Sequence, residues 1–287
     1  MTLPVRLTLA LACLLLAACG STPTTTTSAT ASGAGASASA TSAPAGSGEV
    51  VVPLAGSPPL AGHPWFLAVG DSITSGFTID QSRAGVNSAW PLQLQALLAT
   101  RGEPWSLYDV ACPGETMASY TSGCHDRLVR TELGGKPQRD LALAAITAHL
   151  ADLKLILVDL GSNDLLRTLR GGGDQAAAAA ALRTSLTATV AELRAAAPGV
   201  PLVLANYYNP LANLIPTTEA SLVPVNAVVA AVAHAQGVTL VDFHAAINTQ
   251  PPPDSTLCQW VDCAHIDIHP TVAGHQRLAR AALAVVP

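Results

Sequence analysis

The stretch Phe66-Leu67-Ala68-Val69-Gly70-Asp71-Ser72-Ile73-Thr74 sets the fold class of the chain. Residues 66–70 are apolar without polar alternation, which is typical of a short strand buried on both faces. Gly70 ends this run and permits a sharp turn. We therefore expect Ser72 at the carboxyl end of a parallel strand, where open α/β sheets bind ligands. Taken alone, Gly-Asp-Ser is also an ordinary turn or helix cap.

Strands and helices alternate along the rest of the chain. The predicted strands are 66–70, 105–112, 153–160, 200–207 and 238–243, and helical periodicity marks 88–100, 139–150, 174–197, 221–236 and 271–286. This alternation predicts βαβ units around a parallel sheet. The predicted fold class is α/β: a three-layer α/β/α sandwich with a central parallel five-stranded sheet, formed by residues 63–287 as one domain. Long loops after the strands should emerge at the same edge as Ser72.

The first 18 residues have the pattern of a signal peptide. Arg6 precedes an apolar run at 7–18, which is too short to span a bilayer. The sequence Leu-Ala-Ala-Cys at 16–19 resembles a bacterial lipobox, which implies cleavage before Cys19 and attachment of lipid to its thiol. Cys13 is a second candidate, and a plain secretory signal is the alternative. The chain is thus expected to be exported and anchored to the membrane on its extracytoplasmic side.

Residues 19–62 are predicted to comprise the lipidated cysteine and a disordered linker. The tract is built of Ser, Thr, Ala, Gly and Pro with almost no charge, so it cannot bury enough apolar surface to fold. As a flexible tether it would span about 35 Å. A stalk that is trimmed or glycosylated is the alternative interpretation.

Composition limits the classes of partner. Charged residues make up only 11% of the chain and the formal net charge is -5, and no basic stripe is present, so we expect no nucleic-acid partner. Aromatic residues make up 4%, which predicts a ligand pocket lined mainly by aliphatic side chains and backbone. We expect a monomer that uses no cofactor and no metal.

Four cysteines lie in the predicted domain, namely Cys112, Cys124, Cys258 and Cys263. In an exported chain they indicate two disulfides, with three possible pairings. Proximity along the sequence favours Cys112–Cys124 and Cys258–Cys263. A zinc site is the competing interpretation, although the paired Cys-x-x-Cys elements typical of zinc sites are missing.

Acyl transfer by a serine needs a base, a group that orients the base, and donors that face the developing oxyanion. His269 is the candidate base, because Asp267 is near it and Pro270 fixes the backbone that follows. The candidate donors are the N–H groups of Ser72 and Gly114 and the side-chain amide of Asn163. Gly114 also fits a plain Pro-Gly turn, and Asn163 also fits a helix cap or an Asx-turn.

Together these segments resemble the SGNH, or GDSL-type, family of serine esterases and lipases. Gly70-Asp71-Ser72-Ile73 matches the first block of the family, and residues 111–116, Ala-Cys-Pro-Gly-Glu-Thr, resemble the second. Residues 161–164, Gly-Ser-Asn-Asp, match the third, and residues 267–270, Asp-Ile-His-Pro, resemble the last. The resemblance implies a flavodoxin-like fold, catalysis by Ser72 and His269, and an oxyanion hole of Ser72, Gly114 and Asn163.

One position departs from the family pattern. The last block usually carries aspartate three residues before the histidine, and here that position is Ile266. Asp267 is therefore the expected acid, reaching His269 through a modified turn. A backbone carbonyl and Asp262 are the alternatives.

The predicted function is hydrolysis of carboxylic esters, such as lipids, acetylated glycans or small esters, through an acyl-enzyme on Ser72. An α/β-hydrolase would need Gly-x-Ser-x-Gly, and Thr74 occupies the last of those positions. A metal-dependent hydrolase could use His265, Asp267, His269 and His275. A non-catalytic domain that binds the cell envelope is the alternative from another functional class.

Overall fold

The structure is a computed structural model that describes residues 57–77, 88–124 and 130–287. The predicted signal peptide (1–18), Cys19 and the linker up to residue 56 lie outside the described residues. The last residues of the predicted linker are described, and there the Gly62 N–H donates to Asp152 Oδ2 at 2.8 Å.

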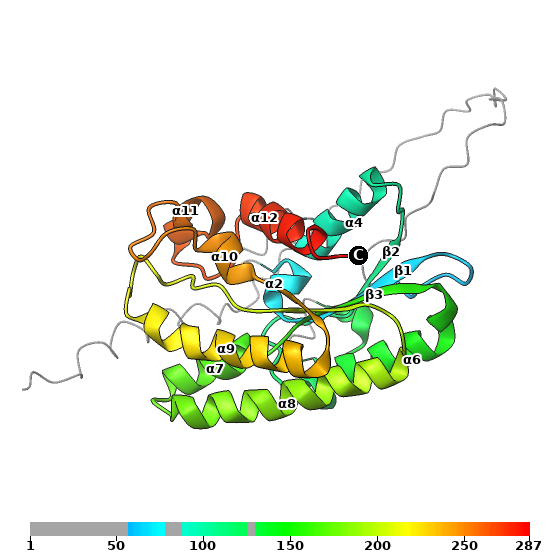
Figure 1. The fold of residues 1–287 in the computed structure, drawn as a ribbon, viewed down its shortest axis with the longest axis horizontal. Helices are drawn as coiled ribbons and strands as arrows, with labels where there is room; N and C mark the ends of the chain where they lie inside the picture. The colour runs from blue at the N-terminus through cyan, green and yellow to red at the C-terminus, as the bar shows by residue number, and fades with distance from the viewer. Residues whose placement is uncertain (1–56, 78–87, 125–129) are drawn as a thin grey trace, which may run out of the picture. The chain divides into compact units, whose positions relative to one another are not determined.

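A five-stranded parallel sheet forms the centre of the domain (Figure 1). Its order is β2-β1-β3-β4-β5. The strands are β1 (Trp65–Gly70), β2 (Ser106–Asp109), β3 (Leu153–Asp159), β4 (Leu202–Ala205) and β5 (Thr239–Val241). The strand that precedes Ser72, β1, is buried along its whole length between β2 and β3. This arrangement confirms the predicted α/β fold class.

Helices cover both faces of the sheet. Successive β1 side chains point to opposite faces and so pack against different sets of helices. Phe66 and Ala68 pack with α4 (Trp90–Thr100), α10 (Phe243–Ile247), α11 (Leu257–Trp260) and α12 (Val272–Leu283). Leu67 and Val69 pack on the other face with α6 (Gln138–His149), α7 (Ser162–Arg170), α8 (Gln175–Ala196) and α9 (Thr218–Gln236). The result is the predicted three-layer sandwich.

Short helices fill the loops at the sheet edges. They are α2 (Ser72–Ser75), α5 (Ser119–Ser122), η3 (Thr131–Leu133), η4 (Leu150–Asp152) and η5 (Cys263–His265). The first of them, α2, follows β1 directly and begins at Ser72.

Some element boundaries differ from the prediction. The helix predicted at 221–236 begins three residues earlier, so Pro224 lies inside α9 and not in its first turn. The strand predicted at 105–112 ends at Asp109, although the N–H groups of Val110 and Cys112 still bond to the carbonyls of Ala68 and Gly70. Helix α7 was not predicted, because its first residues have the composition of a turn.

Both cysteine pairs favoured by proximity lie at disulfide distance. The Cα atoms of Cys112 and Cys124 are 5.7 Å apart, and those of Cys258 and Cys263 are 5.2 Å apart. The first pair brackets the loop that contains Gly114, and the second lies just before the segment that carries His269. Both bridges therefore restrain loops at the sheet edge that carries Ser72.

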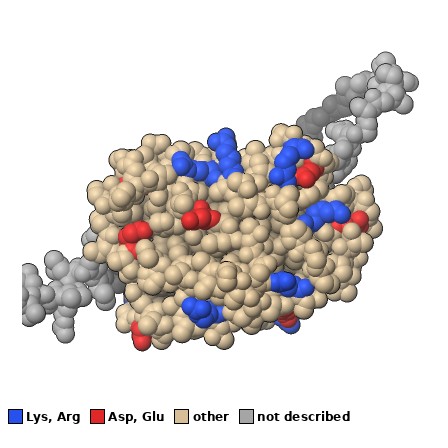
Figure 2. All heavy atoms as spheres, viewed as in Figure 1, with Lys and Arg blue, Asp and Glu red and all other residues tan. Residues whose placement is uncertain are grey.

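Charged side chains are sparse on the face of the molecule drawn in Figure 2, where Lys and Arg lie apart from one another. This distribution agrees with the low charged fraction of the sequence.

Gly161 lies between β3 and α7, and a substitution there tests how closely this turn packs against its neighbours. Its φ is +108°, and a Cβ there would overlap Leu182 Cδ1 and lie 2.6 Å from Tyr207 Oη. We expect Gly161→Ala to lower the free energy of unfolding by about 3 kcal/mol, from overpacking and the left-handed backbone together. Urea denaturation measures the loss.

The matched control is Gly199→Ala. Gly199 also has a positive φ, +80°, but its Cβ would meet nothing within 4 Å. This variant should lose only the backbone cost of about 1 kcal/mol. Equal losses in the two variants would contradict the steric argument.

Candidate active site

Ser72 stands at the carboxyl end of β1, in the first position of α2. Asp71 caps this helix by accepting the Ile73 N–H at Oδ1, 2.9 Å away. A Cβ on Gly70 would overlap the side chain of Thr74, so the turn before Ser72 needs a glycine. Because the first N–H groups of a helix have no partner within the helix, the Ser72 N–H is suited to face a ligand.

His269 is paired with Asp267. Asp267 Oδ1 lies 2.5 Å from His269 Nδ1 and also accepts the His269 backbone N–H at 3.1 Å. Both residues are buried. Asp262, the alternative acid, instead has Oδ2 2.7 Å from Nδ1 of His265. The geometry thus brings Asp267, and not Asp262, to the imidazole of His269.

The turn before Asp267 explains how this pairing is reached. Ile266 has a φ of 53°, and among the described residues no other non-glycine residue has a positive φ. A β-branched side chain rarely adopts this left-handed conformation, and such strained positions concentrate at functional sites. The Ile266 side chain is half exposed at 50%, so it gains little from burial. The left-handed turn brings the following carboxylate to His269.

Phe77 connects the Ser72 turn to His269. Its N–H donates to the Ser72 carbonyl at 3.0 Å. Its ring meets the His269 ring edge-to-face, with centroids 5.3 Å apart. Ser72 and His269, almost two hundred positions apart in the sequence, therefore both contact Phe77.

Asp71 connects the Ser72 turn to the start of α7. Its Oδ2 accepts a hydrogen bond from the Ser162 hydroxyl and lies 3.2 Å from Asn163 Nδ2. A carboxylate can accept hydrogen bonds but cannot donate them, so this contact turns the NH₂ group of Asn163, and not its oxygen, toward Asp71. Asn163 is thereby oriented as a donor.

Gly114 lies in the loop after β2, with a φ of +73° and open space where a Cβ would be. Asp164 holds this loop by accepting the Met117 N–H at 2.9 Å. The N–H group of Gly114 is therefore carried by a loop that α7 anchors.

A buried glutamine, Gln138, also joins these loops. Its Nε2 donates to the Gly70 carbonyl at 2.7 Å and to Glu115 Oε2 at 2.5 Å, and its Oε1 accepts the Gly70 N–H at 3.1 Å. Sequence analysis did not name Gln138, and it named Glu115 only as part of the block 111–116. No local pattern marks their contact, because it joins distant segments.

Buried acids surround the Ser72 turn. Burial raises the pKa of Asp71, although the hydrogen bonds from Ser162 and Ile73 oppose this shift. Burial also raises the pKa of Glu115. The pKa of Asp159 is raised well above its usual range by burial and by the neighbouring Asp71 carboxyl. The Thr74 hydroxyl donates to Asp159 Oδ2 at 3.0 Å, so the Asp159 carboxyl lies against α2.

His275 is buried in α12. Burial and the nearby His269 lower its pKa to about 3. His275 therefore stays neutral at ordinary pH. Within the ranges that the structure describes, no group of three or more His, Cys, Asp or Glu side chains is arranged to hold a metal ion.

The pH dependence of stability tests the buried acids. A carboxyl whose pKa is higher in the folded than in the unfolded chain favours folding at low pH, and this contribution is lost as pH rises. For Asp159 the loss begins near its unfolded pKa of 3.8. We expect Asp159→Asn, which can still accept from Thr74, to gain stability relative to the wild type between about pH 4 and 7.

Urea denaturation of both proteins across this range measures the difference. A difference in unfolding free energy that stays constant with pH would contradict a raised pKa at Asp159.

Comparisons with known proteins show the family of the chain. A family model described as the GDSL-like lipase/acylhydrolase family matches residues 68–277. No curated protein matches the chain. Among solved structures, a lipase from a goat rumen metagenome shares 15% identity, with a TM-score of 0.56 over 77% of this chain and 96% of that one.

Two further structures are similar. A GDSL-like lipase from Parabacteroides merdae shares 16% identity, with a TM-score of 0.55 over 79% of this chain and 96% of that one. A catalytic mutant of Axe2, an acetylxylan esterase from Geobacillus stearothermophilus, shares 19% identity, with a TM-score of 0.53 over 79% and 94%. At these identities the likeness shows the fold. Because the family model spans most of the domain, the chain belongs to the GDSL-like lipase/acylhydrolase family and is a carboxylic ester hydrolase.

Proposed function

We propose that the chain is an extracytoplasmic serine esterase that forms an acyl-enzyme on Ser72. Ser72 Oγ attacks the ester carbonyl carbon, and His269 Nε2 takes the hydroxyl proton. The tetrahedral intermediate then collapses, and the leaving alcohol takes the proton from His269. Water attacks the acyl-enzyme by the same steps and releases the carboxylic acid and free Ser72. The reaction needs no cofactor and no metal.

The pairing of Asp267 with His269 is the observation that carries this proposal. A carboxylate 2.5 Å from Nδ1 holds the proton on that nitrogen, which leaves Nε2 as the basic nitrogen. The same carboxylate stabilises the imidazolium that forms when His269 accepts a proton. The contact of Phe77 with both the Ser72 carbonyl and the His269 ring supports the placement of base and nucleophile in one site.

Three donors are proposed to bind the oxyanion. The N–H of Ser72 begins a helix, the N–H of Gly114 lies on an anchored loop, and the Asn163 amide is oriented by Asp71. Neutral donors fixed before the reaction stabilise a developing alkoxide without reorganisation. Removing one such donor typically lowers kcat by about 10²–10³-fold.

The proposed location rests on the N-terminal sequence. A signal peptide at 1–18 and a lipidated Cys19 would anchor the chain, and residues 20–62 would hold the domain away from the membrane. The two cysteine pairs at disulfide distance fit an oxidising compartment. We propose that the enzyme acts there as a monomer.

Covalent labelling tests the nucleophile. A p-nitrophenyl alkylphosphonate should label the wild-type protein once, at Ser72, and abolish hydrolysis of p-nitrophenyl acetate, because the phosphonate resembles the tetrahedral intermediate. Ser72→Ala should neither label nor hydrolyse, and Asp267→Asn should lower kcat by about 10⁴-fold. Mass spectrometry of the peptides locates the label.

Ser122→Ala is the matched control, because Ser122 is an exposed serine on α5, and it should label and hydrolyse as the wild type does. Unlabelled but folded wild-type protein, with no hydrolysis of any ester, would favour a non-catalytic envelope-binding domain.

Cell fractionation tests the anchor. Expressed in a bacterium, the full chain should sediment with membranes, and Cys19→Ala should release it from them, because a lipid chain needs the Cys19 thiol. Cys13→Ala is the matched control and should remain in the membrane fraction. Equal membrane association of Cys19→Ala and the wild type would exclude anchoring through Cys19.

A further inference from the structure

An apolar pocket lies beside the proposed catalytic residues. Its volume is about 100 Å³. Helix α7 lines it with Leu165, Leu166 and Leu169, and α9 lines it with Leu222. The loop after β4 forms a further wall with Tyr207, Tyr208 and Leu211.

The pocket adjoins the site from two sides. Ile73 lines it and directly follows Ser72, and Ile268 lines it and directly precedes His269. The Tyr208 hydroxyl donates to the Ile268 carbonyl at 2.7 Å, so the pocket wall and the His269 segment are bonded to each other. The pocket is therefore lined by an immediate sequence neighbour of each proposed catalytic residue.

Most polar side chains of the pocket are hydrogen-bonded within the protein. The Tyr207 hydroxyl donates to the Leu160 carbonyl at 2.5 Å, and the Ser162 hydroxyl donates to Asp71. Asn206 Nδ2 donates to Asp242 at 2.9 Å. Asp159 and Thr218 likewise have partners in the chain. A bound sugar would need hydrogen-bonding groups that are not already paired, whereas an aliphatic chain needs none.

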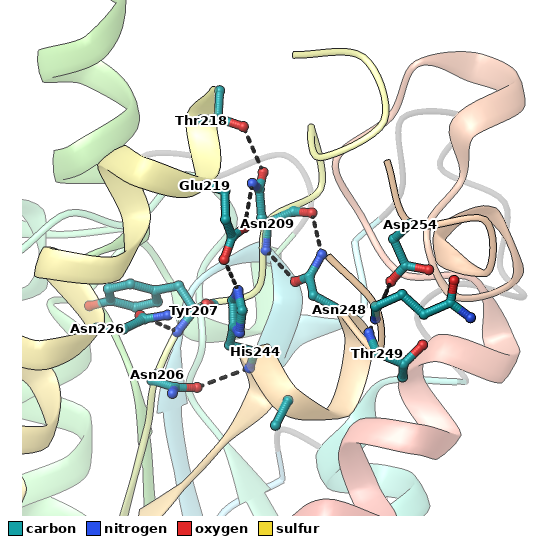
Figure 3. A network of polar contacts seen from close by, with 12 residues as sticks. Asn206, Tyr207, Asn209, Thr218, Glu219, Asn226, His244, Asn248, Thr249 and Asp254 are labelled. Carbon is teal, nitrogen blue, oxygen red and sulfur yellow. Dashed lines mark hydrogen bonds and ion pairs between the residues drawn. The ribbon is translucent and has the colours of Figure 1, made fainter. Parts of the chain in front are cut away.

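Asparagine side chains fix the loop that forms the wall (Figure 3). Asn226 accepts the Tyr207 N–H at 3.0 Å and donates to the Tyr207 carbonyl at 2.8 Å. Asn248 makes the same pair of bonds with Asn209, at 2.7 and 2.9 Å. Glu219 adds contacts to the Asn209 amide at 2.9 Å and to His244 Nε2 at 2.7 Å. These bonds fix the conformation of the loop, so the pocket wall keeps its shape without a ligand.

We infer that this pocket binds the acyl chain of the ester, and that the preferred substrates carry a short aliphatic acyl group and not an acetyl group. This inference rests on the proposed function. An apolar cavity of about 150 Å³ holds one benzene molecule. A pocket of about 100 Å³ therefore has room for about four carbon atoms beyond the carbonyl.

The acyl-length dependence of hydrolysis tests the pocket. With p-nitrophenyl esters, kcat/KM should rise about fourfold for each added methylene between acetate and about pentanoate, because each methylene leaves water. It should level off for octanoate and dodecanoate, whose chains exceed the pocket. A flat or falling profile from acetate to pentanoate would overturn the inference.

A second series varies the alcohol at fixed acetate, from methyl to hexyl acetate. Here kcat/KM should change less than in the acyl series. A steeper rise with alcohol length than with acyl length would assign the pocket to the leaving group and overturn the inference.

Variants locate the effect. Leu166 is only partly buried, so Leu166→Trp should fill the pocket without disturbing the core. It should lower the ratio of kcat/KM for hexanoate over acetate by about tenfold. Leu150→Trp, an exposed leucine on η4 outside the pocket, is the matched control and should keep the wild-type ratio.

Failure of this inference is distinguishable from failure of the proposed function. If Ser72 labels and acetate is hydrolysed while Leu166→Trp leaves the ratio unchanged, the pocket assignment alone is wrong. If no ester is hydrolysed, calorimetric binding of hexanoate decides the assignment. Hexanoate that binds the wild type but not Leu166→Trp supports an alkyl-binding pocket, and no binding to the wild type overturns it.

Discussion

The paired hydrogen bonds between the Gln138 side chain and the backbone of Gly70 hold the end of β1, and the rest of the site depends on them. Gly70 is the last residue of β1, and its backbone groups are buried where water cannot satisfy them. An unpaired buried backbone group costs free energy comparable to a lost hydrogen bond. One amide side chain bonds to both groups, while the Cys112 N–H also donates to the carbonyl, and together these bonds fix the chain where it turns toward Ser72.

Three loops at the sheet edge close on one another around that point. Asp71 bonds to Ser162 and Asn163, Asp164 bonds to the Met117 N–H, and Glu115 bonds to Gln138, which returns to Gly70. Burying several carboxyl groups near one another costs folding free energy, which is why the pKa values of Asp71, Glu115 and Asp159 are raised. The same connections hold the proposed oxyanion donors in place before any substrate binds, and preorganisation of this kind stabilises developing charge. The site therefore combines a local loss of stability with a rigid polar geometry.

The neighbouring pocket is apolar, in contrast to the network of buried carboxyl groups. Most of its polar groups are paired within the protein, and its leucines and tyrosine rings present an apolar surface. In the proposed mechanism the polar network stabilises the reacting carbonyl, whereas the pocket binds the remainder of the acyl group. Ile73 and Ile268 belong to both regions, because each is the sequence neighbour of a proposed catalytic residue. Chemistry and selectivity are thus placed on adjacent residues of the same two turns.

Local sequence determined the alternation of strands and helices, the position of Ser72 after β1 and the pairing of the four cysteines by proximity. These features depend on periodicity, on turn residues and on short separations along the chain. Only the tertiary structure showed which carboxylate reaches His269. The pairing depends on a left-handed turn at Ile266, and a β-branched residue gives no sign of such a turn in the sequence. Gln138 and Glu115 were likewise invisible in sequence, since the Gln138 contact with Gly70 spans 68 residues. Such contacts arise from the packing of whole elements, which no local pattern encodes.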